Sequence, residues 1–192
     1  MTEISKYFPK GMTPRPGQRD ALLEIEQKWD TNDVIVLNAD VGAGKSAALQ
    51  TIARWRASKG ESTATLTPRV TLQDQYKASF KDIDMLQGKS RYKCKDSTFK
   101  SCHEKHEITE NYCPGCPYAA DRKAAKETKN GVFSVHSYLM LGERKDNLLC
   151  DEVHSLYSIM SDQMTLKLWQ HKVGYPDGLS DYGPIVTGKP RS

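Results

Sequence analysis

Apolar residues follow two different spacings along the chain, one typical of amphipathic helices and one typical of buried strands. Helical intervals separate four apolar residues of the segment 17–30, namely Ala21, Leu22, Ile25 and Trp29. Residues 33–39 instead form a short continuous apolar run rich in β-branched side chains, which predicts a strand buried on both faces.

The two patterns then alternate along the chain. Further helices are predicted at residues 45–59, 70–80 and 117–129, and further strands at residues 62–68, 131–137 and 147–153. Strands that alternate with helices form parallel sheets covered by helices on both faces. We therefore expect an α/β fold.

The pattern breaks between residues 88 and 116, where Lys, Cys, His and Ser dominate and no apolar period persists. After Leu156 it fades into a tail rich in Gly, Pro and Asp. The expected organisation is a first part of the lobe at 1–87, a cysteine-rich insertion at 88–118, a second part at 119–160, and an irregular, truncated tail at 161–192.

Composition adds little about partners but more about the compartment. The chain has 192 residues, is 38% hydrophobic and carries a net charge of +4, which favours nucleic acid only weakly. There is no apolar run of about 18 residues to span a membrane. The N-terminus also lacks the apolar stretch of a secretory signal, so a cytoplasmic protein without a membrane partner is expected.

A phosphate-binding loop is predicted at residues 39–46, with the pattern A-x-x-x-x-G-K-S. Glycines at 42 and 44 allow the backbone N–H groups to face an anion at the start of a helix. Lys45 would reach the β- and γ-phosphates of ATP, and the Ser46 hydroxyl would ligate Mg²⁺. The expected nucleotide-binding residues are Ala39, Gly42, Ala43, Gly44, Lys45 and Ser46. The alternative is a glycine-rich turn before an ordinary helix, but the strand–loop–helix context favours the nucleotide site.

The stretch "LLCDEVH" (148–154) is an apolar run that ends in two carboxylates, Asp151 and Glu152. Asp151 would hold Mg²⁺ directly or through water, and Glu152 would orient and deprotonate the attacking water. The alternative, an acidic loop after a strand, is common, but the pairing with a phosphate loop favours a catalytic role.

Four cysteines lie in the insertion with the spacing C-x7-C-x10-C-x2-C: Cys94, Cys102, Cys113 and Cys116. Disulfides are rare in the cytoplasm, so a metal site is the better interpretation. Zinc could use the close pair Cys113 and Cys116 together with His103 or His106. An iron–sulfur cluster takes four thiolates at less regular spacings, so local chemistry leaves both open. The fifth cysteine, Cys150, is interpreted as a buried apolar residue.

The sequence "DEVH" resembles the DEAH box of superfamily 2 helicases, with Val153 in place of alanine. Other stretches fall in the order found in XPD/DinG-type iron–sulfur helicases, and the resemblance covers residues 10–156. They are "RPGQ" (15–18), "TLTPRVTLQDQY" (65–76), "LQGKSRYKC" (86–94), "CPYAADRKAA" and "GVFSVHSYLML".

This resemblance implies a RecA-like P-loop NTPase lobe of an ATP-dependent DNA helicase. Gln18 would read the adenine edge, and His154 would couple the nucleotide site to the nucleic-acid surface. The four cysteines would hold a [4Fe–4S] cluster, which leaves His103 and His106 as solvated loop residues. The stretch 65–76 would touch the nucleic-acid backbone.

Basic residues surround Tyr92 at the start of the insertion: Lys89, Arg91, Lys93 and Lys95. Such a stretch suits single-stranded or forked DNA, through phosphate contacts and base stacking. The alternative is a solvated charged face.

The 36 residues after Leu156 leave no room for the second RecA-like lobe that the resemblance implies. We therefore expect this chain alone to bind nucleotide, to hydrolyse it slowly and not to unwind DNA, with a second lobe or partner chain completing it. The alternatives are a P-loop ATPase with a structural zinc knot and a non-catalytic remnant that binds DNA or nucleotide.

Overall fold

The computed structural model describes residues 3–40, 42–155 and 158, so the tail predicted at 161–192 lies outside the described residues. The helices in this part are α1 (Pro16–Lys28), α2 (Lys45–Ser58), α3 (Val70–Ser79), α4 (Cys102–Thr109), α5 (Pro117–Glu127) and α6 (Val135–Leu141). The strands are β1 (Thr63–Thr67), β2 (Asp84–Leu86), β3 (Asn130–Ser134) and β4 (Asn147–Cys150).

The strands form one parallel sheet in the order β2-β3-β1-β4. In the register of this sheet, Thr63 of β1 lies beside Asn130 of β3 and Asn147 of β4. The carboxyl ends of the central strands therefore meet at one edge, as in other α/β folds that bind ligands there. The predicted α/β fold with a parallel sheet, the RecA-like arrangement, is confirmed.

The two faces of the sheet have different chemistry because successive side chains point to opposite sides. Ala64, Leu66 and Phe133 pack on one face in a core that also includes residues of α5 and α6. The other face carries the buried threonines of β1 and Val132, and α2 and α3 lie against it. Both faces are thus covered, as the apolar and β-branched strand sequences require.

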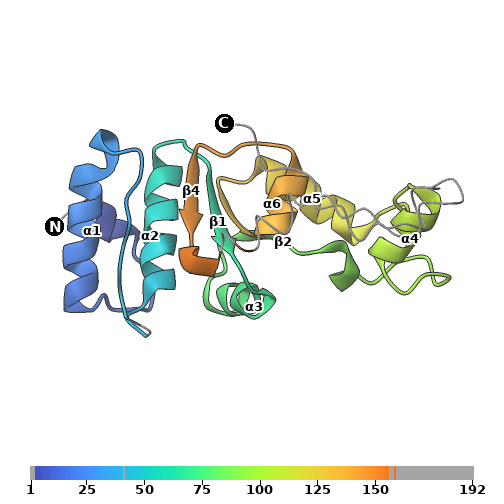
Figure 1. Ribbon diagram of the computed structural model, residues 1–192, viewed down its shortest axis with the longest axis horizontal. Coiled ribbons are helices and arrows are strands. Elements are labelled where there is room, and N and C mark those ends of the chain that lie inside the picture. Colours follow the sequence, from blue (N-terminus) through green and yellow to red (C-terminus); the bar gives the residue numbers. More distant parts are fainter. Residues whose placement is uncertain (1–2, 41, 156–157, 159–192) are drawn as a thin grey trace, which may run out of the picture.

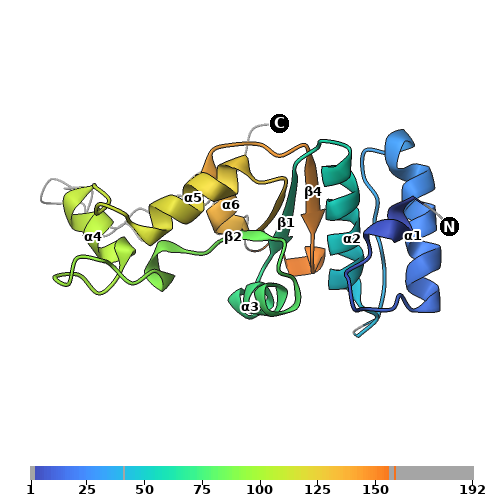
Figure 2. The same ribbon diagram turned by 180° about the vertical axis from the view of Figure 1, so that it is seen from behind.

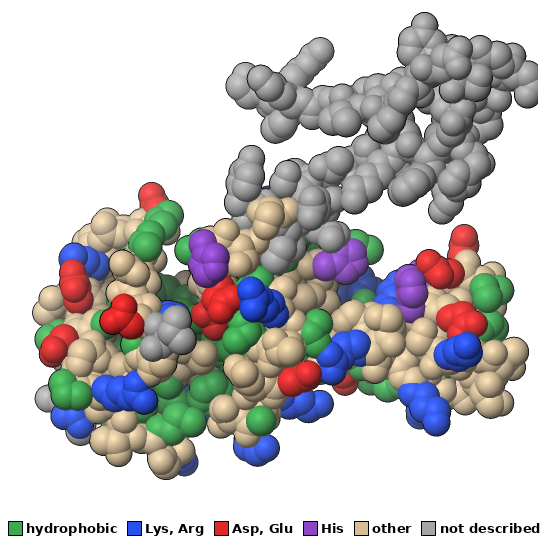
Figure 3. Space-filling model, turned by 60° about the horizontal axis from the view of Figure 1, so that its bottom comes forward, with side chains coloured by type: hydrophobic (Ala, Val, Ile, Leu, Met, Phe, Trp, Pro, Cys, Tyr) green, Lys and Arg blue, Asp and Glu red, His purple; other side chains and the backbone are tan. Residues whose placement is uncertain are grey.

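The molecule is elongated, with α1 and α2 at one end and the insertion helix α4 at the other (Figures 1 and 2). On the face drawn in Figure 3, basic and acidic side chains are interspersed over the described surface, and the basic ones do not gather into one continuous patch. None of the helices formed by the described residues is long and apolar enough to cross a membrane.

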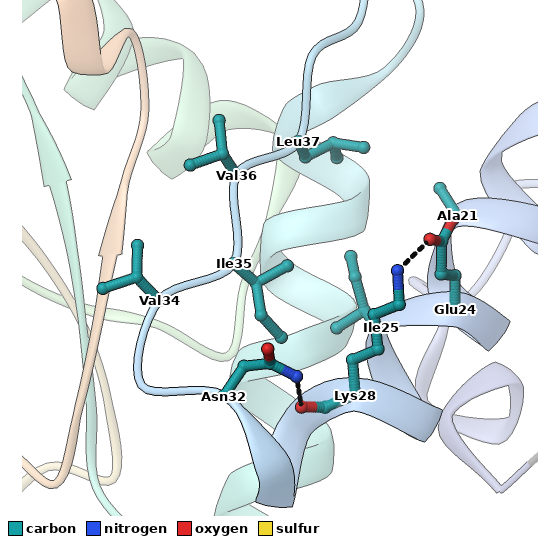
Figure 4. A pocket seen from close by; sticks show the side chains of 9 residues that line it. All are labelled: Ala21, Glu24, Ile25, Lys28, Asn32, Val34, Ile35, Val36 and Leu37. Carbon is teal, nitrogen blue, oxygen red and sulfur yellow. Dashed lines mark hydrogen bonds and ion pairs between the residues drawn. The ribbon is translucent and has the colours of Figure 1, made fainter.

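The strand predicted at residues 33–39 is wrong, because the segment is extended but does not pair with the sheet. Ile35 and Leu37 pack against the core formed by α1 and α2. Val34 and Val36 point the other way and are 77% and 78% exposed. The segment and α1 enclose a shallow pocket of about 250 Å³ (Figure 4). An apolar run does not distinguish a strand buried on both faces from an extended segment that packs on one side.

Other differences concern short elements and their ends. The insertion contains the helix α4, and β2 precedes it; no sustained period predicted either of them. β3 ends at Ser134, three residues earlier than predicted, because the Ser134 hydroxyl accepts a hydrogen bond from the Ser137 N–H (3.0 Å) and caps α6.

Candidate nucleotide site and cysteine cluster

The predicted phosphate loop lies directly before α2, and its residue 41 is outside the described part of the chain. Gly42 and Gly44 have φ angles of +82° and +86°, in the left-handed region that favours glycine. α2 begins at Lys45, so its first N–H groups, which lack carbonyl partners within the helix, and its dipole face the loop. This local geometry suits an anion.

Lys45 folds back over the loop. Its Nζ donates hydrogen bonds to the carbonyl oxygens of Ala39 (2.9 Å) and Asp40 (3.0 Å). An ammonium binds phosphate oxygens more strongly than neutral carbonyl oxygens, because both the donor and the acceptor are charged in an ammonium–phosphate hydrogen bond. A nucleotide phosphate would therefore compete effectively for this ammonium group.

The start of α1 contacts the loop through Gln18 and Arg15. The Gln18 side chain donates to the Gly44 carbonyl (2.9 Å) and accepts from the Arg15 backbone N–H (2.9 Å). The Arg15 guanidinium also donates to the Gly42 carbonyl. Gln18 thus supports the loop, and its adenine-reading role stays a prediction.

We expect Gly44→Ala to lower the stability of the chain. A Cβ here would require a left-handed alanine and would collide with the Gln18 side chain, at a cost of about 1–3 kcal/mol. For a chain of this size that corresponds to a Tm lower by about 2–12 °C.

Gly17→Ala is the matched control, because a Cβ on Gly17 meets no heavy atom within 4 Å. Its Tm should stay the same or rise slightly. Equal Tm values for the two variants in a thermal melt would contradict the constraint on Gly44.

Asp151 follows β4 at the carboxyl edge of the sheet and is only 4% exposed. Its backbone N–H donates to the Leu66 carbonyl (2.9 Å), which extends the ladder between β4 and β1. Burial raises the pKa of the Asp151 carboxyl, and the hydrogen bond from Tyr76 and the charge of Lys45 act in the opposite direction. Lys45 of the phosphate loop therefore acts electrostatically on this carboxylate.

Tyr76 of α3 is a residue of this site that sequence reasoning missed. Its hydroxyl donates to Asp151 Oδ2 (3.1 Å), and the Ser46 hydroxyl lies near enough to act on the pKa of Tyr76 in the lowering direction. The two oxygen groups predicted to hold Mg²⁺ therefore converge on one phenol. The sequence offered no specific signal, since a tyrosine at a buried helix position usually serves packing.

Glu152 lies in the turn after β4 with a φ of +52°, which is unusual for a residue with a side chain. Such a conformation costs about 1–2 kcal/mol and often occurs at functional sites. His154 follows on an exposed 3-10 turn, Val153–Ser155. The catalytic roles of both residues stay predictions.

The four cysteines of the insertion are buried together at the end of the core that covers one face of the sheet. The Sγ atoms of Cys102 and Cys116 are 3.5 Å apart. The thiols of Cys94 and Cys116 lie near enough to Cys113 to act on its pKa, so all four side chains are neighbours. The thiols come from separated parts of the insertion, so folding of the insertion gathers them.

The thiols differ in acidity. Burial, followed by the hydrogen bond with Cys116, raises the pKa of Cys102 to about 11. Burial would also raise the pKa of Cys113, but the Lys95 backbone N–H and the neighbouring thiols lower it below its ordinary value. Cys113 is thus readily converted to the thiolate that binds metal.

A tight turn places Cys113 and Cys116 side by side. The Cys116 N–H donates to the Cys113 carbonyl (3.0 Å), with Pro114 and Gly115 between them and a φ of +63° at Gly115. Proline followed by a glycine with positive φ is the signature of a type II turn. The "CPGC" sequence therefore explains why these two thiols are neighbours.

Within the described ranges, no group of three or more His, Cys, Asp and Glu side chains is arranged to hold a metal ion. A Mg²⁺ ion usually uses one or two carboxylates, water and substrate phosphates, so Ser46 and Asp151 fit it chemically without forming such a group. Four buried thiols are likewise suitable ligands for zinc or an iron–sulfur cluster.

The predicted location of His103 and His106 in a loop is wrong, because both lie on α4. The His103 side chain is largely exposed, and its Nε2 atom lies 3.3 Å from Glu107 Oε1. The His106 ring is half-buried and lies 5.0 Å from the ring of Tyr112.

Part of the basic stretch around Tyr92 is engaged within the protein. Arg91 pairs with Asp74 of α3 (3.2 Å), and the Tyr92 hydroxyl donates to Asp121 (2.9 Å). Lys93 and Lys95 are exposed, so they are the members of the stretch best placed to meet phosphates. A free stacking surface on Tyr92 is less compatible with its half-buried ring, which packs on another tyrosine.

Comparison with known proteins gives one family. The family model described as "Type III restriction enzyme, res subunit" matches residues 11–172, which is most of the chain. No curated protein and no solved structure matches the chain.

Proposed function

Since this chain belongs to the family of type III restriction enzyme res subunits, and thus carries the N-terminal lobe of a superfamily 2 helicase-like ATPase, we propose that it drives ATP-dependent movement on DNA. Single-stranded or forked DNA is the proposed substrate, and the resemblance to XPD/DinG-type helicases refines the family to an iron–sulfur type. The observation that carries the ATPase assignment is the convergence of Ser46 and Asp151 beside the phosphate loop.

Different residues of the site would bind the phosphates, hold the metal ion and activate the attacking water. The N–H groups at the start of α2 and the Lys45 ammonium bind the phosphates of ATP. Ser46 and Asp151 would hold Mg²⁺, which when bound neutralises charge on the β- and γ-phosphates. Glu152 accepts the proton of the attacking water as that water bonds to the γ-phosphorus and ADP leaves.

Stepping along DNA needs a second RecA-like lobe that closes on the nucleotide and supplies an arginine to the transition state. We propose that a further part of the protein or a partner chain provides this lobe. The 192-residue chain by itself would then hydrolyse ATP slowly and not unwind DNA.

Glu152→Gln should lower single-turnover ATP hydrolysis by about 100-fold or more, because a general base contributes about 10²–10⁴-fold to such rates. Nucleotide affinity should stay unchanged, since the amide preserves the shape of the Glu152 side chain. Release of labelled phosphate and equilibrium binding of an ATP analogue measure the two effects. An equal slow rate in both proteins would show that Glu152 is not the base and favour a non-catalytic binding protein.

We propose further that the four cysteines hold a [4Fe–4S] cluster. The proposal rests on the resemblance to iron–sulfur helicases and on the four buried thiols, which match the four thiolates that such a cluster takes. One observation favours zinc as a second candidate. Tetrahedral zinc with Zn–S bonds of about 2.3 Å places sulfur atoms roughly 3.8 Å apart, and the Cys102 and Cys116 sulfurs lie 3.5 Å apart. Metal and sulfide analysis of anaerobically purified protein distinguishes the two.

A further inference from the structure

Tyr76 has a position that packing alone does not require. It lies on α3, which covers the face of the sheet opposite the cysteines, and it is 1% exposed. Its ring packs against Phe80, with 5.6 Å between ring centroids, and against Val132. A phenylalanine would satisfy these contacts equally well. The hydroxyl is therefore the part of the side chain that needs an explanation.

The hydroxyl lies between the phosphate loop and the acidic turn. It donates to Asp151 Oδ2 at 3.1 Å, and the Ser46 hydroxyl lies beside it. These partners come from the end of β4 and the start of α2, which are about 100 residues apart in sequence. Tyr76 is thus the direct connection between the two groups that would bind the metal.

A buried carboxylate needs donors that hold it in one orientation. The Tyr76 hydroxyl donates to the Asp151 carboxylate, and the adjacent Glu152 backbone N–H acts to lower the pKa of the same carboxyl. Because Tyr76 engages Oδ2, rotation of the Asp151 carboxylate is restricted. Hydrogen-bond partners of this kind typically change metal affinity by about 10–100-fold when they are removed.

We propose that Tyr76 is a positioning residue for the magnesium–nucleotide site, which holds Asp151 and Ser46 at the relative placement that Mg²⁺ requires. The assignment rests on the proposed ATPase function. It adds a helix, α3, to the elements that build the metal site, besides the phosphate loop and β4.

The test is Tyr76→Phe, which keeps the ring packing and removes only the hydroxyl. A fluorescent ATP analogue is titrated against the full 192-residue chain, once in EDTA and once over a series of Mg²⁺ concentrations. We expect unchanged affinity in EDTA and a Mg²⁺ requirement raised by about 10-fold or more. A change confined to the Mg²⁺ series distinguishes positioning from a general loss of structure.

Tyr138→Phe is the matched control. Tyr138 lies on α6, which covers the other face of the sheet, and its hydroxyl accepts a hydrogen bond from the backbone N–H of Lys145 (3.3 Å). This variant should behave like the wild type in both titrations, and a thermal melt of each variant reports its folding.

Two results would overturn the assignment while leaving the ATPase proposal intact: a Mg²⁺ dependence of Tyr76→Phe equal to that of the wild type, or an equal loss of affinity in EDTA and Mg²⁺. A wild-type chain that binds the analogue under neither condition would overturn the proposed function itself, and the role of Tyr76 with it.

Discussion

Lys45→Ala is expected to bind ATP about 100-fold more weakly than the wild-type chain. The Lys45 ammonium donates to the loop carbonyls of Ala39 and Asp40, and it would exchange these bonds for bonds to phosphate oxygens. A hydrogen bond to a charged group contributes about 1.5–3 kcal/mol, so losing one such bond corresponds to roughly 10- to 150-fold in affinity. Calorimetric titration with a non-hydrolysable ATP analogue measures the change.

Lys59→Ala provides the control, because Lys59 caps the far end of the same helix and pairs with Glu3 (3.4 Å). It removes the same charge from the same element without touching the loop, so its affinity should equal that of the wild type. Similar losses in both variants would show that net charge, and not the phosphate loop, determines binding.

Cys116→Ser is expected to release the metal of the insertion. Cys116 contacts Cys102 and Cys113 and precedes α5, so its thiol is central to the set. We expect about four iron and four sulfide per wild-type chain and almost none in the variant. Iron and acid-labile sulfide assays, with the visible absorbance of the cluster, check the result.

Cys150→Ser is the control for this experiment. Cys150 lies at the end of β4, half-buried and packed at the margin of the same core as the four insertion cysteines. Its replacement should leave the metal content unchanged. One zinc per wild-type chain without iron would reject the cluster and favour the zinc site, and the same metal content in Cys116→Ser would reject both.

Elements with a clear local pattern could be predicted from the sequence. The helical spacing of apolar residues located α1 and α2 closely, and the β-branched run in β1 gave its position within a residue. The segment 33–39 could not be predicted this way, because its pairing depends on which surface is nearest in the folded chain. The sequence of α4 is largely polar, so it contains no apolar period that would predict a helix. The helix begins instead at a side-chain cap, in which Ser101 accepts a hydrogen bond from the Glu104 N–H.

Much of the candidate site follows from motif spacing, because a phosphate loop and a strand-end carboxylate must meet at the same sheet edge. The proximity of Ser46 to Asp151 was therefore foreseeable. Tyr76 was not, since its role depends on the angle at which α3 crosses the sheet. The contact of Gln18 with Gly44 likewise depends on tertiary packing of α1 against the loop.

The helix α3 has a mechanical consequence. Asp74, which pairs with Arg91 at the start of the insertion, and Tyr76, which reaches Asp151, are two residues apart and so lie about 200° apart around the helix. The Asp74–Arg91 ion pair is exposed and adds little stability, but it attaches one side of a short rigid rod to the insertion. A small rotation of α3 about its axis would move both contacts together. A displacement of the insertion at Arg91 would therefore also shift the contact of Tyr76 with the Asp151 carboxylate.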